Sequence, residues 1–143
     1  MCGIAGALSA SPSEPGNRAL VERLCAALTH RGPDDAGLHA DGPAVLGHRR
    51  LSILDLSAEG RQPFLSEDGR VAAAVNGEIY NHHELRRELE GQGHRFRSRS
   101  DSEVLVHLYE EEGERCVTRL RGMMALELGF RAAVDGRTLR GSR

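Results

Sequence analysis

The second residue of the chain is a cysteine at the head of a short apolar segment, and this position constrains the chain more than any other feature. Residues 2–8 are small or apolar throughout, which is typical of a buried strand. Removal of Met1 would leave Cys2 with both a thiol and a free α-amine. The usual pKa of an α-amine is ~7.7–8.0, so this amine can take the thiol's proton near neutral pH. The alternative is a structural strand that contains a cysteine, and retention of Met1 would block the chemistry.

Composition predicts one ordinary globular domain. The chain has 143 residues, of which 39% are hydrophobic and 28% charged, and its net charge is −2 with both signs interspersed. We expect no nucleic-acid-binding or membrane-binding surface from this balance. No signal peptide or membrane-spanning run is present in the sequence, so we expect a cytoplasmic protein. The three cysteines are widely spaced and lack a CxxC pair, which predicts neither a disulfide framework nor a metal site.

Hydrophobic periodicity predicts alternating strands and helices. Leu20, Leu24 and Leu28 recur at helical spacing and predict a helix over 17–29. Cys25 and Cys116 are expected to pack as small hydrophobic side chains. The histidines, His82 and His83 among them, are interpreted as surface or capping residues. Further strands are predicted over 36–40, 44–53, 71–76 and 123–128, and further helices over 81–91, 101–113 and 114–121. Asn81, followed by Glu84, is predicted to cap the first of these helices, and Asp101 or Ser102 the second.

Three motifs are unusual for purely structural segments. The run from Arg49 to Asp55 places guanidinium groups in an otherwise apolar strand, where a buried charge needs a partner. Asn76-Gly77-Glu78 directly follows a buried strand, with a glycine where backbone can approach a ligand closely. Ser100 to Glu103 places a carboxylate at a helix start. The structural alternatives are a solvated edge arginine, a β-turn and a helix N-cap.

Together with Cys2, these motifs can handle the amide of an α-amino acid. An arginine can bind an α-carboxylate through two hydrogen bonds, and Asp101 can accept hydrogen bonds from an α-ammonium group. The side-chain amide of Asn76 and the N–H of Gly77 can donate to the oxygen that becomes negative when Cys2 attacks. One such donor is typically worth ~100–1,000-fold in rate. The coincidence of four motifs favours a site over four separate structural explanations.

Five strings in this order and spacing resemble the N-terminal glutaminase domain of glutamine-hydrolysing asparagine synthetases, which are class II glutamine amidotransferases. The resemblance covers about residues 2–126. It implies an α+β fold of the N-terminal-nucleophile hydrolases, an αββα sandwich of antiparallel sheets, incomplete at its C-terminus. We therefore expect a partial amidotransferase domain over 1–128 and a tail of unclear structure over 129–143. The strings are MCGIAG at 1–6, HRGPD at 30–34, RLSILD at 50–55, NGEIYN at 76–81 and SDSE at 100–103.

The resemblance also implies roles for individual residues. Cys2 would be the nucleophile that forms a glutamyl thioester, and Asn76 and Gly77 would form the oxyanion hole. Arg50 would bind the carboxylate of glutamine, while Glu78 and Asp101 would bind its amino end. The segment from Arg31 to Asp35 would form the pocket rim or its supporting turn, without a chemical step. The rest of the pocket lining would be Leu51, Ser52, Ile53 and Leu54.

Cofactors and partners follow from the same resemblance. Hydrolysis of L-glutamine needs no cofactor, whereas ATP and Mg²⁺ belong to the synthetase domain, where ammonia and aspartate yield asparagine. No phosphate-binding glycine loop for such a domain occurs in this sequence. The expected partners are therefore a separate synthetase chain or a second copy. Two alternatives stay open: a non-catalytic remnant with a frame-shifted tail, and a subunit that supplies ammonia to another amide-forming ligase.

Overall fold

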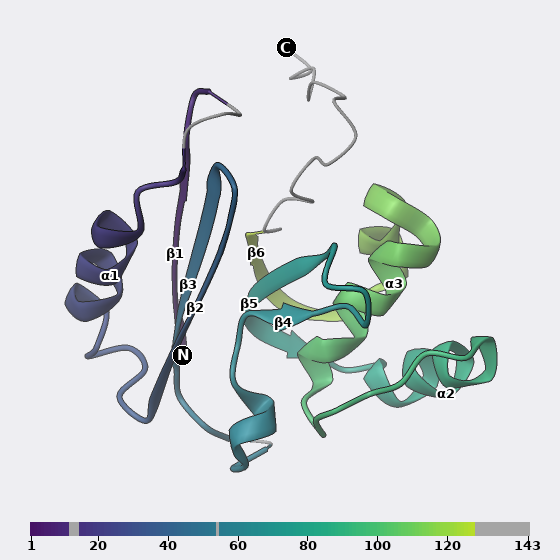
Figure 1. Ribbon diagram of the computed structural model, residues 1–143. Helices are drawn as coiled ribbons and strands as arrows, with labels where there is room; N and C mark the ends of the chain where they lie inside the picture. Colours follow the sequence, from purple (N-terminus) through teal and green to yellow (C-terminus); the bar gives the residue numbers. More distant parts are fainter. Residues whose placement is uncertain (12–14, 54, 128–143) are drawn as a thin grey trace.

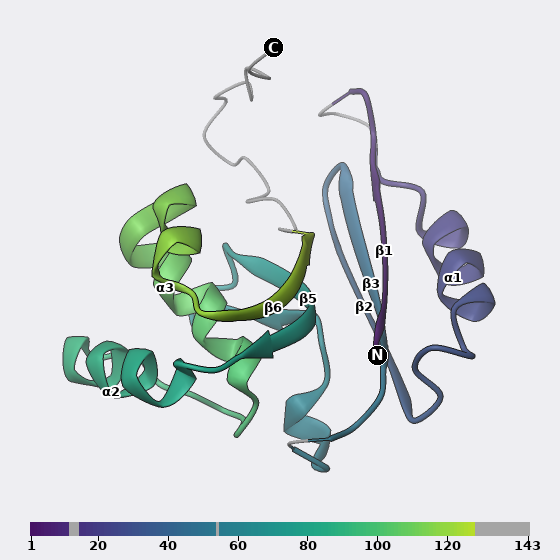
Figure 2. The same ribbon diagram turned by 180° about the vertical axis from the view of Figure 1, so that it is seen from behind.

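The computed structural model describes residues 1–11, 15–53 and 55–127, and it places two antiparallel sheets face to face between helices (Figure 1). The first sheet has the order β1-β3-β2 and the second the order β4-β5-β6. Helix α1 covers the outer face of the first sheet, while α2 and α3 lie beyond the second, as both views show (Figures 1 and 2). The predicted α+β class and αββα layering are confirmed. The elements are β1 (Gly3–Leu8), α1 (Arg18–Ala27), β2 (Asp35–Asp41), β3 (Ala44–Arg50), β4 (Phe64–Leu65), β5 (Ala72–Ile79), α2 (His82–Gln92), α3 (Val104–Glu112) and β6 (Gly122–Glu127).

The first sheet is joined to α1 by close packing at a glycine. Gly47 lies in the central strand β3, where a Cβ would come within 2.4 Å of the Cys25 sulfur and 2.7 Å of Val21. The missing side chain lets α1 approach the sheet directly. Both helix residues are buried there, and burial raises the pKa of the Cys25 thiol. The prediction that Cys25 packs as a hydrophobic side chain is confirmed.

The second sheet shares a larger core with α2 and α3. Helix α3 is buried along most of its length because β5, α2 and the following 3₁₀ segment Gly113–Arg119 surround it. Cys116 is fully buried in this core, as predicted. The other buried residues of this core are Phe64, Val71, Ala73, Val75, Ile79, Leu85, Leu89, Val104, Leu105, Val106 and Leu108.

His48 links the two sheets. This residue of β3 is fully buried, and its Nε2 donates to the carbonyl of Val75 in β5 over 3.1 Å. Burial lowers the pKa of His48 to about 4, so the imidazole is neutral at physiological pH. The interpretation of all histidines as surface or capping residues was therefore wrong for His48. It was also wrong for His107, which is 1% exposed within α3.

Several element boundaries differ from the prediction. The strand expected over 44–53 ends at Arg50, and the strand expected over 71–76 continues to Ile79, so Asn76-Gly77-Glu78 lies within a strand rather than after it. Helix α2 ends at Gln92 and is capped by Gly93, with φ +106, whereas it was expected to close near Gly91. Its predicted Asn81 cap is absent, because that amide donates to the carbonyl of Arg119 and accepts from the N–H of Arg121.

The start of α3 also differs from the expectation. A 3₁₀ turn over Asp101–Glu103 leads into α3, and Ser100 caps this turn in place of the expected Asp101 or Ser102, since its hydroxyl accepts from the N–H of Ser102. A 3₁₀ segment over Gly113–Arg119 replaces the helix predicted over 114–121. The expected tail over 129–143 lies outside the described residues, as does Leu128 of the last predicted strand. None of the described helices has the length and apolar character needed to span a membrane.

The buried histidine predicts a specific loss of stability in acid. Since the pKa of His48 is lowered from 6.5 to about 4, the unfolded chain binds the proton first. The stability it contributes is therefore complete above pH 6.5 and is lost as the pH falls towards 4, by roughly 3 kcal/mol. We expect His48→Gln to show a smaller fall in unfolding free energy between pH 6.5 and 4, measured by urea titration. The exposed His83→Gln should keep the original pH dependence, and equal profiles for both variants would contradict this assignment.

Candidate active site

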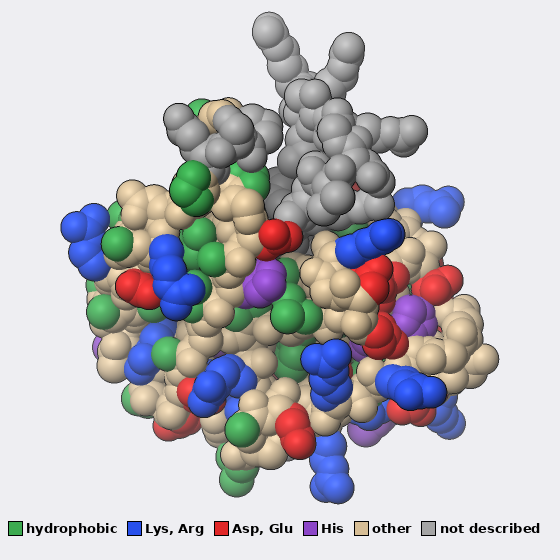
Figure 3. All heavy atoms as spheres, in the orientation of Figure 1, with side chains coloured by type: hydrophobic (Ala, Val, Ile, Leu, Met, Phe, Trp, Pro, Cys, Tyr) green, Lys and Arg blue, Asp and Glu red, His purple; other side chains and the backbone are tan. Residues whose placement is uncertain are grey.

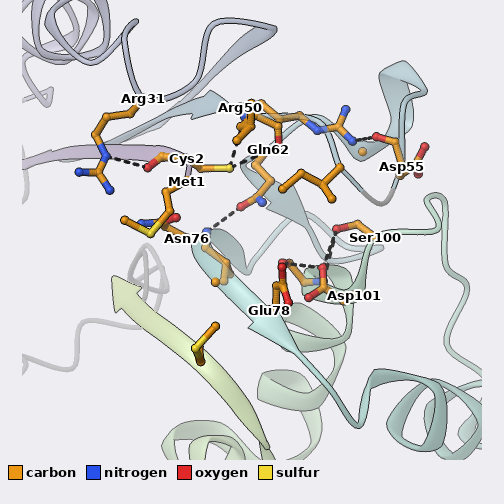
Figure 4. A pocket seen from close by; sticks show the side chains of 17 residues that line it. Met1, Cys2, Arg31, Arg50, Asp55, Gln62, Asn76, Glu78, Ser100 and Asp101 are labelled. Carbon is orange, nitrogen blue, oxygen red and sulfur yellow. Dashed lines mark hydrogen bonds between the residues drawn. The ribbon is translucent and has the colours of Figure 1, made fainter.

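A pocket of about 530 Å³ gathers residues from both sheets (Figure 4). Its walls come from the beginning of β1, the loop that follows β3, the strand β5 and the 3₁₀ turn that precedes α3. These segments are far apart in the sequence, and the sandwich brings them together. The pocket therefore depends on the relative placement of the two sheets.

Cys2 is half-buried at the pocket wall, and backbone groups hold it on two sides. The N–H of Leu51 donates to the Cys2 sulfur over 3.4 Å, and the thiol lies 3.9 Å from the carbonyl of the same residue. The Cys2 carbonyl accepts a hydrogen bond from Nε of Arg31 over 3.1 Å. The strand β1 begins at the next residue and anchors this end of the chain. The thiol is thus placed by the loop after β3 as well as by its own strand.

Met1 occupies part of the pocket wall. Its side chain is 73% exposed and lies beside the pocket-facing Cys2. In this form of the chain the nitrogen of Cys2 belongs to a peptide bond, so it cannot accept the thiol's proton. Removal of Met1 would create the α-amine and widen the pocket at the same place.

Arg50 is buried behind the pocket wall and binds the loop that follows it. The residue is 7% exposed; Nη1 donates to the carbonyl of Ser57 over 2.9 Å, and Nη2 donates to the carbonyl of Asp55. The Asp55 carboxylate accepts from the N–H and hydroxyl of Ser57 and from the N–H of Arg99. The hydrogen bonds from Ser57 and Arg99 lower the pKa of Asp55. The loop after β3 therefore folds back around the guanidinium of Arg50, which these hydrogen bonds hold in place.

The opposite wall is formed by β5. Asn76 is half-buried there, whereas Gly77 and Glu78 are exposed to the pocket mouth. The strand is fixed just before Asn76, because the N–H of Val75 donates to Oε1 of the buried Gln62 over 2.6 Å. Gln62 and His48 therefore bind the two backbone polar groups of Val75.

Asp101 lies at the end of the pocket where the 3₁₀ turn meets β5. It is 5% exposed, and its Oδ2 accepts from the N–H of Ile79 over 2.7 Å. Its Oδ1 accepts from the hydroxyls of Ser100 and Ser102, at 3.4 and 3.2 Å. An ionised carboxylate has about four acceptor positions, so Asp101 retains capacity for a cationic ligand.

Most of the residues predicted for the site line this one pocket. They are Cys2, Arg50, Leu51, Ile53, Asn76, Gly77, Glu78 and Asp101. Their chemical roles stay predictions. Ser52 is not a lining residue; its N–H donates to the Asp34 carboxylate over 2.7 Å. Leu54 lies outside the described residues. Arg31 lines the pocket and Asp34 supports its loop, which agrees with the interpretation of that segment as rim and supporting turn.

Several lining residues had no role assigned from the sequence. Asp55 and Ser100 lie inside recognised motifs, and this position in the sequence could have identified them as pocket residues. No sequence pattern identifies Gln62 or Gly60 as a pocket residue, because each contacts a backbone group or a side chain distant in the sequence. No cluster of metal-binding side chains among the described residues lines this pocket. The lining residues without an assigned role are Met1, Asp55, Gly60, Gln62, Val75, Ser100, Ser102 and Met123.

The fold matches that of a solved amidotransferase. The glutamine phosphoribosylpyrophosphate (PRPP) amidotransferase from B. subtilis, complexed with ADP and GMP, superposes with a TM-score of 0.69. The match has 23% sequence identity and covers 87% of this chain and 34% of the other. The two antiparallel sheets and their helices thus have the N-terminal-nucleophile amidotransferase fold.

The sequence comparison then shows the family. The sequence model of the glutamine amidotransferase domain family matches residues 1–133, so the chain belongs to that family. An asparagine synthetase [glutamine-hydrolyzing] of Triphysaria versicolor is 48% identical over 128 residues, and asparagine synthetase [glutamine-hydrolyzing] 1 of Lotus japonicus is 46% identical over the same length. Each alignment covers 90% of this chain and 21% of the relative, so the chain spans about a fifth of their length.

The packing of Gly60 against Arg50 predicts that a side chain at position 60 destabilises the fold. A Cβ on Gly60 would lie 2.2 Å from Nη2 of Arg50, so the guanidinium would have to leave its carbonyl partners. We expect Gly60→Ala to lower the unfolding free energy by about 1–3 kcal/mol, measured by urea titration. Gly91→Ala is the matched control, since that helical glycine has open space around it and should gain about 0.5–1 kcal/mol. A Gly60→Ala variant as stable as the parent would show that Arg50 moves freely.

Proposed function

We propose that the chain hydrolyses glutamine, with Cys2 as the nucleophile once Met1 has been removed. The observation that carries the proposal is the shared pocket: the thiol of Cys2 opens into the same cavity as Arg50, Asn76 and Asp101. These four residues come from four separate sequence motifs. Membership of the glutamine amidotransferase domain family supports glutamine as the substrate. The curated relatives carry names that describe glutamine-hydrolysing enzymes, which supports the same reaction.

The proposed reaction has two steps. The α-amine of Cys2 takes the thiol's proton, and the sulfur adds to the side-chain carboxamide carbon of glutamine. The carbon–nitrogen bond breaks and ammonia leaves with the transferred proton, which yields a glutamyl thioester. Water then attacks the thioester carbon, and the carbon–sulfur bond breaks to release glutamate and the thiol. The N–H of Gly77 and the amide of Asn76 would donate to the oxyanion in both steps.

The charges of the pocket suit the two ends of an amino acid. Arginine has five N–H donors, so Arg50 can hold the carbonyls of its own loop and still bind an α-carboxylate. Asp101 and Glu78 would bind the α-ammonium group at the other end. The side chains of Leu51 and Ile53 provide the apolar part of the wall.

The fate of the ammonia belongs to the same proposal. The names of the relatives support use of the ammonia in asparagine synthesis, for which the resemblance implies an ATP-dependent reaction of aspartate. That step would take place outside this chain's pocket, on a synthetase domain or a partner chain that binds ATP and Mg²⁺. The glutaminase step itself would use no cofactor.

Glutamate and ammonia release from glutamine test the proposal. We expect the processed chain to turn over glutamine, and Cys2→Ala to lose on the order of 10³-fold or more of the rate. Insertion of Glu between Met1 and Cys2 prevents removal of Met1 and should cause a comparable loss. Cys25→Ala, which removes a buried thiol outside the pocket, should keep the activity.

Two outcomes would contradict the proposal. Activity of the insertion variant would exclude the α-amine as the base. A folded, processed chain that releases no glutamate would favour a non-catalytic form of the domain.

A further inference from the structure

Four side chains that can bind a metal ion converge outside the pocket. Glu67 lies in the turn that joins β4 to β5, His94 follows the end of α2, and His107 and Glu110 lie one turn apart on α3. One ligand atom from each residue lies within 4.8 Å of the other three. Figure 3 shows acidic side chains around a histidine on the part of the surface where α2 and α3 lie. From this arrangement we propose a binding site for one zinc-like divalent transition metal ion.

Four distances between ligand atoms are close to those of tetrahedral coordination, one of them measured to each oxygen of Glu67, while a set of one atom from each residue spans up to 4.8 Å. Zinc binds nitrogen and oxygen at about 2.0–2.2 Å, so neighbouring ligand atoms in a tetrahedron are roughly 3.3–3.6 Å apart. Nδ1 of His107 lies 3.1 Å from Oε2 of Glu67 and 3.4 Å from Oε2 of Glu110. Nδ1 of His94 lies 3.4 Å from Oε1 of Glu67 and 3.7 Å from Oε2 of Glu110. Only small movements would be needed to bind an ion.

His107 provides an independent reason to expect a ligand. Its side chain is 1% exposed, and neither ring nitrogen has a hydrogen-bond partner of adequate geometry among the described residues. A buried polar group without a partner is costly, and a neutral imidazole is a common metal ligand. A cation between Nδ1 and the two glutamates would give this nitrogen a partner.

The groups behind the ligands are also those of a metal site. Metal-binding histidines commonly direct their second nitrogen at a carboxylate, which orients the ring. Nε2 of His94 lies 3.0 Å from Oε1 of Glu111, in this arrangement. Oε1 of Glu67 accepts from the N–H of Arg95 over 2.8 Å, which fixes this carboxylate toward the cluster.

The charge of the cluster calls for a cation. Two carboxylates, those of Glu67 and Glu110, lie 3.1 and 3.4 Å from the same nitrogen of His107. A divalent ion would neutralise these carboxylates and would tie the β4–β5 turn and the end of α2 to α3. With four protein ligands the site would be structural rather than catalytic. This departs from the expectation of no metal site, because the ligands come from segments with no recognisable ligand spacing.

Zinc binding to the metal-free chain tests the site. The Cys2→Ala chain is used so that the exposed thiol does not compete, and zinc is titrated by calorimetry after chelator treatment. We expect one zinc per chain, and a loss of affinity of at least about 100-fold in Glu110→Gln and in His107→Gln. The double variant His82→Gln/His83→Gln is the matched control, since that neighbouring pair lies outside the cluster and should not change binding.

Cobalt(II) gives a second measurement that does not depend on the variants. We expect the strong visible absorption of tetrahedral Co²⁺ in the Cys2→Ala chain, abolished by an excess of zinc. Absence of one-to-one binding, weak octahedral absorption, or equal affinity in the folded Glu110→Gln variant would each overturn the proposal. If His107→Gln does not fold, Glu110→Gln and the cobalt spectrum still decide the result. Glutamine hydrolysis does not enter this test, so its outcome is independent of the proposed function.

Discussion

The buried guanidinium of Arg50 is the constraint on which the pocket depends. A charge removed from water needs partners, and the carbonyls of Asp55 and Ser57 supply them only if the loop after β3 folds back on itself. The same loop begins at Leu51, whose N–H contacts the Cys2 sulfur. It passes Gly60, where only hydrogen fits beside the guanidinium. One buried cation thus shapes the wall against which the cysteine lies.

The second constraint is the junction between the sheets. Strand β4 pairs with β5 only at Ala72 and Ala73, and beyond this point side chains take over the hydrogen bonding. Gln62 accepts from the N–H of Val75, and His48 donates to its carbonyl. These two contacts fix the residue that precedes Asn76, and they place this wall of the pocket opposite Cys2 of the first sheet. The polar contacts that hold the sandwich together are therefore also those that position the site.

Much of this arrangement follows from the sequence, and the missing part has a common physical cause. Short motifs predicted that Cys2, Arg50, Asn76 and Asp101 share one pocket, because each motif combines a reactive, polar or charged side chain with a local backbone signal. Single buried polar residues were not predicted: Gln62 and His48 bind backbone groups distant in the chain, and His107 lies beside the distant Glu67, so no local pattern marks them. The prediction that Asn81 caps α2 was wrong for the same reason, since its side chain bonds to the backbone of Arg119 and Arg121 in place of the first turn of the helix.

The most direct test is the intact mass of the purified chain before and after reaction with a diazoketone analogue of glutamine. Our account predicts loss of Met1, one covalent adduct that maps to Cys2, and protection by free glutamine. The contradictory result is a processed chain that gains no adduct from the analogue although iodoacetamide alkylates the same thiol. Such a chain would have an accessible cysteine without a glutamine pocket around it.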